Sequence, residues 1–285
     1  MGGEKLSTKH IRKFTGTILV NAVLILFSIS CIFPVVWMVY SSLKTSPEFN
    51  RSIITLPERP VFENYIDAFR ISHMGTYYLN TVFNAAVSLV LAVVMSYVMG
   101  YFLSRFKFKG RNLIYFTILF GMLIPVHALL IPLFIQFKSL GLFDQRFTLI
   151  IPYVAFAMPF SVFLTESYLT GVPIEMEEAA VIDGSGFIRM LFTIIMPLCT
   201  PILITVAILQ LFTKWWNEFP FALVLVNSEK YKTIPIGLLN FSSQYSTNYP
   251  MKMAAITLAI LPVILIYIFF NRKIIEGMIA GAIKG

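Results

Sequence analysis

The chain has 285 residues, is 58% hydrophobic and only 13% charged, and carries a net charge of +8. Soluble domains are about 45–50% apolar and about 25% charged, so this composition excludes an ordinary soluble domain and favours a membrane protein. The basic residues cluster at the ends of apolar runs, which indicates membrane topology and not nucleic-acid binding. At this length we expect one transport unit without a fused ATPase.

Continuous apolar runs predict an all-α membrane protein. A helix needs roughly 20 residues to cross about 30 Å of hydrocarbon. Six runs are long enough, at approximately 16–40, 77–103, 112–137, 147–165, 190–213 and 253–271. The first run is longer than the apolar part of a signal peptide and lacks a cleavage site, so we expect it to remain as a membrane helix.

The Lys and Arg residues predict the orientation. They are frequent before the first run, in 105–111, and after the sixth run. All three places fall on one side of six spans, and that side should be cytoplasmic. We therefore expect a multi-pass protein of the bacterial cell membrane with both termini inside. The loops 44–75 and 214–252 would then face outside, the first as a folded cap with turns.

The predicted inner loop at 166–189 departs from the basic pattern. It holds one Arg and five acidic residues: Glu166, Glu175, Glu177, Glu178 and Asp183. A basic partner surface would explain this charge. Pro173 suits the first turn of a helix. Gly184 can adopt the left-handed conformation that ends it, and Ser185 can cap the next helix.

The same loop carries a spaced motif. Its fixed positions are Glu178, Ala179, Ala180, Gly184, Ile194 and Pro197, with Met196 where the pattern has Leu. This spacing resembles the EAA loop of permease subunits of bacterial ATP-binding-cassette (ABC) importers. The resemblance implies a loop that couples the permease to a separate ATPase. The residues implied in ATPase coupling are Glu178, Ala179, Ala180, Asp183 and Gly184.

Three further stretches extend the resemblance to maltose-type, MalG-like sugar permeases. They are Trp216–Phe219, Ile234–Leu238 and the ending Glu276–Gly285. The resemblance implies a type I importer (MetI-like) transmembrane domain of six helices. Its core would cover 75–271, after an N-terminal part at 1–74 that holds the first helix and an outer loop. The tail 272–285 would reach the ATPase through Gly281 and Gly285.

The implied partners are a homologous second permease subunit, two ATP-binding subunits, an extracytoplasmic solute-binding protein and membrane lipid, but no nucleic acid. The rival interpretation is a secondary transporter or channel that works alone. Runs without acidic pairs argue against ion coupling. The substrate is expected to be a sugar or oligosaccharide, with a non-sugar solute such as glycerol phosphate as an alternative.

Some single residues permit two interpretations. The polar stripe of Asn80, Asn84 and Ser88 should face protein or a watery cavity, and these residues are candidates for lining a pore. His127 is either a functional ionisable group or a hydrogen-bonded interface residue.

Trp215 and Trp216 fit an aromatic belt at the membrane surface. Prolines in or beside spans can kink their helices or be tolerated there.

We expect no enzyme activity from the chain itself. It has three His and two Cys, and no nucleophile, base and acid at catalytic spacing. The Gly-x4-Gly-Lys-Ser/Thr loop that binds ATP phosphates is absent as well. Catalytic, cofactor-binding and metal-binding residues are therefore not assigned.

Overall fold

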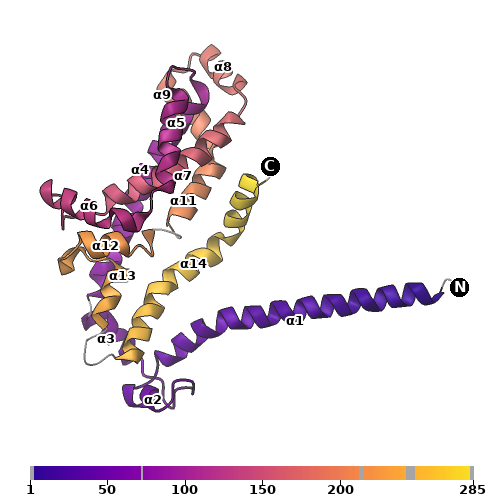
Figure 1. The fold of residues 1–285 in the computed structure, drawn as a ribbon, viewed down its shortest axis with the longest axis vertical. Helices are drawn as coiled ribbons and strands as arrows, with labels where there is room; N and C mark the ends of the chain where they lie inside the picture. Colours follow the sequence, from indigo (N-terminus) through magenta and orange to yellow (C-terminus); the bar gives the residue numbers. More distant parts are fainter. Residues whose placement is uncertain (1–2, 72, 212–214, 242–247, 283–285) are drawn as a thin grey trace. The chain divides into compact units, whose positions relative to one another are not determined.

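The computed structural model of the chain describes residues 3–71, 73–211, 215–241 and 248–282, with side chains over 16–70, 73–211, 215–241 and 248–269. Within these residues all regular secondary structure is helical (Figure 1). This agrees with the predicted all-α fold. The long helices are α1 (Gly3–Ser41), α4 (Met74–Arg105), α7 (Ile150–Thr170) and α14 (Tyr249–Ala282).

The remaining elements are shorter. Before α4 lie α2 (Ser46–Arg51) and α3 (Glu63–Ile71); between α4 and α7 lie α5 (Arg111–Phe120), η1 (Gly121–Leu123) and α6 (Val126–Ser139). After α7 come α8 (Glu175–Ile182), α9 (Phe187–Arg189), the π-helical η2 (Met190–Ile195), α10 (Met196–Leu198) and α11 (Thr200–Gln210). The segment before α14 contains α12 (Pro220–Leu225), η4 (Glu229–Tyr231), α13 (Ile234–Gly237) and η5 (Leu238–Phe241).

Four single helices are long and apolar enough to cross a membrane, and two bent pairs bring the total to six. Four predicted spans are thus single helices: Gly16–Ser41, Met74–Arg105, Ile150–Thr170 and Tyr249–Phe269. The fourth runs further than its predicted end at 165, because α7 continues through the charged Glu166 to Thr170. The predicted number of six spans is reached when each bent pair is counted as one span, and these two spans differ in form from a single helix.

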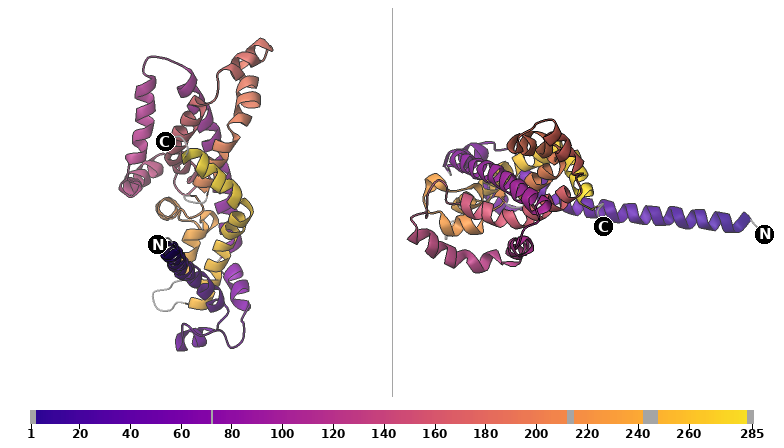
Figure 2. Two further views of the ribbon diagram at one scale, coloured as in Figure 1. Left: turned by 90° about the vertical axis from the view of Figure 1, so that its right-hand side faces the viewer. Right: turned by 90° about the horizontal axis from the view of Figure 1, so that it is seen from above.

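The third predicted span is sharply broken. Arg111–Leu123 and Val126–Ser139 are inclined by 102° to each other (Figures 1 and 2). Pro125 explains the break, because it has no N–H to donate and it pushes the preceding residue out of helical geometry. Ile124 accordingly has an extended backbone, with φ −77° and ψ 117°. The α6 half therefore turns away from the axis of α5.

The fifth predicted span is broken by 74° at Cys199. Pro201 stands in the first turn of α11 and cannot donate to the carbonyl four residues earlier. The π-helical turn at Met190–Ile195 precedes this break. Pro132, Pro159 and Pro262, by contrast, lie inside continuous helices. Proline breaks two of the spans and is accommodated in others.

The chain divides into two units, of which the first comprises 1–69 and 241–258. Its outer-loop part is folded, as predicted for 44–75. Thr45 and Glu48 form a capping box at the start of α2, and the buried Lys44 donates to the carbonyls of Ser52 and Ile53 at 3.0 and 3.3 Å. The Phe49 ring stacks on Tyr249 at 5.4 Å.

The second unit comprises 70–240 and 259–285, and the packing of α4 against α7 forms its centre. Small side chains line this contact: Ala85, Ala92, Ser96 and Gly100 on α4, and Ala157, Ser161 and Thr165 on α7 are all buried. Small residues let helix backbones approach closely in membranes. A Cβ on Gly100 would lie 3.0 Å from the Glu166 nitrogen, so the two helix backbones are in close contact there.

Trp215 and Trp216 correct the aromatic-belt prediction. Their side chains are only 3% and 7% exposed, so they are packed inside the chain and do not face a membrane surface. The indole N–H of Trp216 donates to the Ala259 carbonyl at 3.1 Å. These residues anchor the segment that follows the fifth span to its neighbours.

Candidate ATPase-coupling site

The helix α8 lies at one end of the second unit, away from α13 (Figure 1). It ends as predicted at Gly184, whose φ is +75°. The Ser185 N–H donates to the Ala180 carbonyl at 2.9 Å, and the Gly184 N–H to the Val181 carbonyl at 3.0 Å. This pair of bonds is a Schellman motif, which satisfies the last carbonyls of a helix and needs a left-handed residue.

Two local expectations for this loop are wrong. Pro173 precedes the N-cap residue Ile174 and so lies outside the first helical turn. Ser185 does not cap α9, because the N-cap is Gly186 and no side chain bonds there. The extended Gly186 backbone starts α9 directly after the Schellman turn.

The inner face of α8 is fixed to α4 by a charged cluster. Glu177 accepts hydrogen bonds from Arg105 Nε at 2.5 Å and from the Tyr101 hydroxyl at 2.8 Å. A second nitrogen of Arg105 donates to the Val172 carbonyl at 2.8 Å. The Arg105 and Glu177 side chains are 10% and 12% exposed, so removal of one partner would leave a largely buried charge. We call Tyr101, Arg105 and Glu177 the inner clamp.

A second ion pair lies nearby. Arg111 at the start of α5 donates to Glu166 of α7 at 2.6 Å and to the Leu103 carbonyl at 2.7 Å. Glu166 and Glu177 are therefore balanced inside the chain. The prediction that a basic partner explains the loop's acidity is thus corrected for these two of its five acids. No signal in the sequence pairs residues that lie 55 and 72 positions apart.

The outer face of α8 remains open. Apolar side chains are exposed at Ile174 (51%), Met176 (43%), Val181 (62%) and Ile182 (85%). The acids Glu175, Glu178 and Asp183 and the small Ala179 are exposed beside them. An apolar patch rimmed by charge is typical of a protein interaction surface. We call this set the docking face.

The predicted coupling residues divide between the two faces. Glu178, Ala179, Asp183 and Gly184 are exposed, whereas Ala180 is 4% exposed and packs inward with Tyr97 and Met190. Ala180 is thus placed to support α8 from within. Gly281 lies in α14, and Gly285 falls outside the described residues. Their roles in coupling stay predictions.

The polar stripe on α4 is buried inside the chain. Asn80, Asn84 and Ser88 are 2%, 4% and 0% exposed, so the stripe faces protein. The Asn80 amide nitrogen donates to the carbonyls of Lys230 and Lys232 at 2.9 and 2.8 Å. Asn84 Oδ1 and Ser88 Oγ have no hydrogen-bond partner in the described part of the chain. Pore lining by this stripe stays a prediction.

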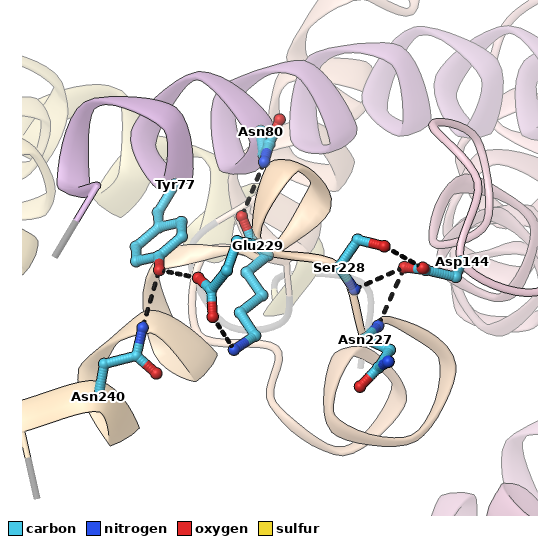
Figure 3. A network of polar contacts seen from close by, with 8 residues as sticks. Tyr77, Asn80, Asp144, Asn227, Ser228, Glu229 and Asn240 are labelled. Carbon is cyan, nitrogen blue, oxygen red and sulfur yellow. Dashed lines mark hydrogen bonds and ion pairs between the residues drawn. The ribbon is translucent and has the colours of Figure 1, made fainter.

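A polar network holds the segment between α12 and α13 against the opposite end of α4 (Figure 3). The Tyr77 hydroxyl donates to Glu229, and it accepts from the Asn240 amide at 2.8 Å. Lys232 Nζ donates to Glu229 at 2.5 Å. Burial raises the pKa of Glu229, but these hydrogen bonds and the Lys232 charge outweigh it, so the pKa is lowered from its usual value.

Asp144 extends the network from the loop after α6. Its carboxylate accepts from the backbone nitrogens of Asn227 and Ser228, both at 3.0 Å, and from the Ser228 hydroxyl. Burial opposes ionisation, but these bonds and the Lys230 charge lower the Asp144 pKa from its usual value. We call Tyr77, Asp144, Ser228 and Glu229 the outer network; sequence reasoning did not identify it.

Comparison with known proteins is consistent with this architecture. Residues 79–279, more than half of the chain, match the family model described as a binding-protein-dependent transport system inner membrane component. A putative ABC transporter permease of Caldicellulosiruptor sp. is 40% identical over 88% of this chain and 91% of its own length. The diacetylchitobiose uptake permease of Streptomyces coelicolor is 35% identical over 93% and 88%.

A solved structure agrees as well. A chain of a bacterial ABC transporter involved in alginate import superposes with a TM-score of 0.79 at 25% identity, covering 92% of this chain and 97% of that one. The family match and the relatives above 30% identity lead to the same assignment. The chain belongs to the family of binding-protein-dependent transport system inner membrane components.

Proposed function

We propose that this chain is a permease subunit of an ATP-driven importer for a sugar or oligosaccharide. Family membership argues against a transporter or channel that works alone. The relatives at 32–35% identity include permeases for diacetylchitobiose, starch degradation products, arabinooligosaccharides and trehalose or maltose, which supports the substrate class. A second homologous permease, two ATPase subunits and a solute-binding protein would complete the importer. ATP hydrolysis would occur on the ATPase subunits.

One observation carries the coupling role: α8 has a clamped inner face and an open docking face. Force from an ATPase can move membrane helices only through a contact that does not yield. The inner clamp joins α8 to α4 with charge-assisted bonds, which are shorter and stronger than neutral ones. The docking face offers apolar contact area, and Glu178 can bond a basic group of the partner. We also propose that the tail with Gly281 and Gly285 approaches the same subunit.

Site-specific crosslinking tests this contact. A photo-crosslinking residue at Ile182, the most exposed of the apolar positions of the docking face, is expected to label the ATPase subunit in the assembled importer. The same group at Gly281 tests the tail. The control is Ile54, which is 73% exposed but lies in the loop predicted to face outside. Equal labelling of the ATPase from Ile54 and Ile182, or none from Ile182, would contradict the proposal.

A further inference from the structure

A cavity of about 330 Å³ lies where α6, α7 and the segment before α12 meet. Its lining includes His127, Tyr153, Phe156, Trp215, Asn217 and Glu218. Small-molecule sites have volumes of about 300–1,000 Å³, with mostly apolar walls and a few polar groups that fix orientation. This cavity has that character, and its volume suits one part of a larger ligand.

The back wall of the cavity is held in place by several contacts. The Tyr153 and Trp215 rings are stacked at 6.3 Å with an interplanar angle of 9°, and each side chain is 3% exposed. Glu218 accepts from the Tyr153 hydroxyl at 2.8 Å and from the Phe221 backbone nitrogen at 2.6 Å. A polar group fixed before the ligand arrives loses little freedom on binding. The wall is thus preorganised.

The mouth of the cavity carries groups suited to hydroxyls. His127 stands in the first turn of α6, directly after the Pro125 bend, and its side chain is exposed, as is that of Asn217. An imidazole ring and an amide both carry groups that can hydrogen-bond to hydroxyls. The partly buried Phe156 in the lining offers apolar surface to the C–H face of a ring. This combination matches the alternating hydroxyl and C–H surfaces of a saccharide.

The charged groups in the cavity lining restrict which ligands can bind there. No Lys or Arg lines the cavity among the described residues, and Glu218 contributes a carboxyl group. Burial raises the Glu218 pKa, partly offset by its hydrogen bonds. A uronate, sulfonate or phosphate ligand would find no cation among the described lining residues and would face repulsion from any ionised Glu218. The lining therefore favours a neutral ligand.

We propose that this cavity contacts one ring of a neutral oligosaccharide during its passage through the importer. The inference rests on the proposed function and adds to it a contact site and a preference for uncharged sugars. His127 is a ligand-contacting residue in this account. Glu218 holds the wall, because it also bonds the start of α12.

The test uses the complete importer in proteoliposomes with saturating solute-binding protein. The neutral probes are diacetylchitobiose, maltotriose and arabinotriose; the acidic probe is an alginate trisaccharide. His127→Ala is expected to lower the sugar imported per ATP hydrolysed about five-fold, the loss expected from one hydrogen bond. His127→Gln should restore most of it. Gln136→Ala, an exposed change further along α6, is the matched control and should match the wild type.

The variants also separate the two proposals. His127→Arg supplies the missing cation and should raise alginate uptake relative to the neutral probe. ATPase copurification should stay unchanged in every variant, since α6, which carries His127, and α8 lie apart in the second unit (Figures 1 and 2). Wild-type ratios for His127→Ala, or wild-type uptake of the acidic probe alone, would overturn the cavity assignment. Import of no saccharide by the wild type would overturn the proposed function and this inference with it.

Discussion

The two ends of α4 are held by different chemistry. At the Arg105 end, the inner clamp binds one face of α8 and leaves the docking face exposed. At the Tyr77 end, Asn80 and the outer network together bind the segment between α12 and α13 on several sides. A helix clamped on one face can transmit force received on the other. A segment bonded on several sides is suited to keep its shape.

The roles given to the two ends of α4 require that the α8 end faces the cytoplasm and the Tyr77 end faces outside. We predict that Ser185 is cytoplasmic and that 214–252 faces outside, from the Lys and Arg distribution. Ser185 Oγ is itself buried, so the 85% exposed Ile182 of the same loop is the better internal position. In a Cys31→Ser background, Ile182→Cys should react with an impermeant thiol reagent only in inside-out vesicles. Ser228 belongs to the outer network, so the exposed Asn227 is the better external position. Labelling of Ile182→Cys in intact cells would refute the topology.

The inner clamp should show the largest energetic effect. Arg105→Met leaves the Glu177 carboxylate largely buried without its cation, and we expect a loss of about 2–4 kcal/mol in folding free energy. The double variant Arg105→Met with Glu177→Met should recover much of that loss. Unfolding of the singles and the double in detergent forms a double-mutant cycle. Additive single losses would mean that the two side chains do not act together.

The outer network should give a smaller effect with a defined pH dependence. Asp144 and Glu229 have usual pKa values of 3.8 and 4.5, and both are lowered in the fold. Their contribution is therefore fully present above about pH 5, and it is lost as the pH falls through the lowered values. Tyr77→Phe should cost about 1 kcal/mol at neutral pH.

Thermal unfolding followed against pH checks this sign. Asp144→Asn should lower stability at pH 7 and flatten the decline below pH 5. Glu63→Gln, an exposed acid of α3, serves as the control. The predicted sign is wrong if the wild type becomes more stable as the pH falls and Asp144→Asn removes that pH dependence.

The sequence predicted features that depend on composition and local geometry. Apolar runs located six spans, and Gly184 marked a left-handed turn. The charge of Glu166 predicts that the span ends at 165, yet α7 continues because Arg111 neutralises this side chain within the fold. The prolines predict possible kinks in the spans. Only the structure shows that Pro125 lies at a 102° bend whereas Pro159 lies inside a continuous helix.

The rest depends on contacts between distant residues. Glu177 and Glu178 are neighbours in a run of acids, and nothing local shows that the first turns inward to Arg105 while the second stays exposed. The cavity at His127 has the same origin, because its walls come from 126–156 and 215–221. Membrane spans are local in sequence, whereas clamps and cavities are made by tertiary packing.

The central claim is that α8 couples this chain to an ATPase, and paired glycine variants test it most directly. Gly184 has φ +75°, whereas Gly186 has φ −67°, and a Cβ would meet nothing within 4 Å at either position. Gly184→Val should strain the turn by about 1–2 kcal/mol and misalign the docking face, while Gly186→Val should be tolerated. Glu178→Lys, compared with Glu63→Lys, tests the charge of the same face.

The measurement is the amount of ATPase that copurifies with each variant, normalised to the membrane-inserted permease. The account predicts a clear loss of ATPase for Gly184→Val and Glu178→Lys, with Gly186→Val and Glu63→Lys at the wild-type level. Wild-type copurification for all four variants would contradict the coupling role of α8.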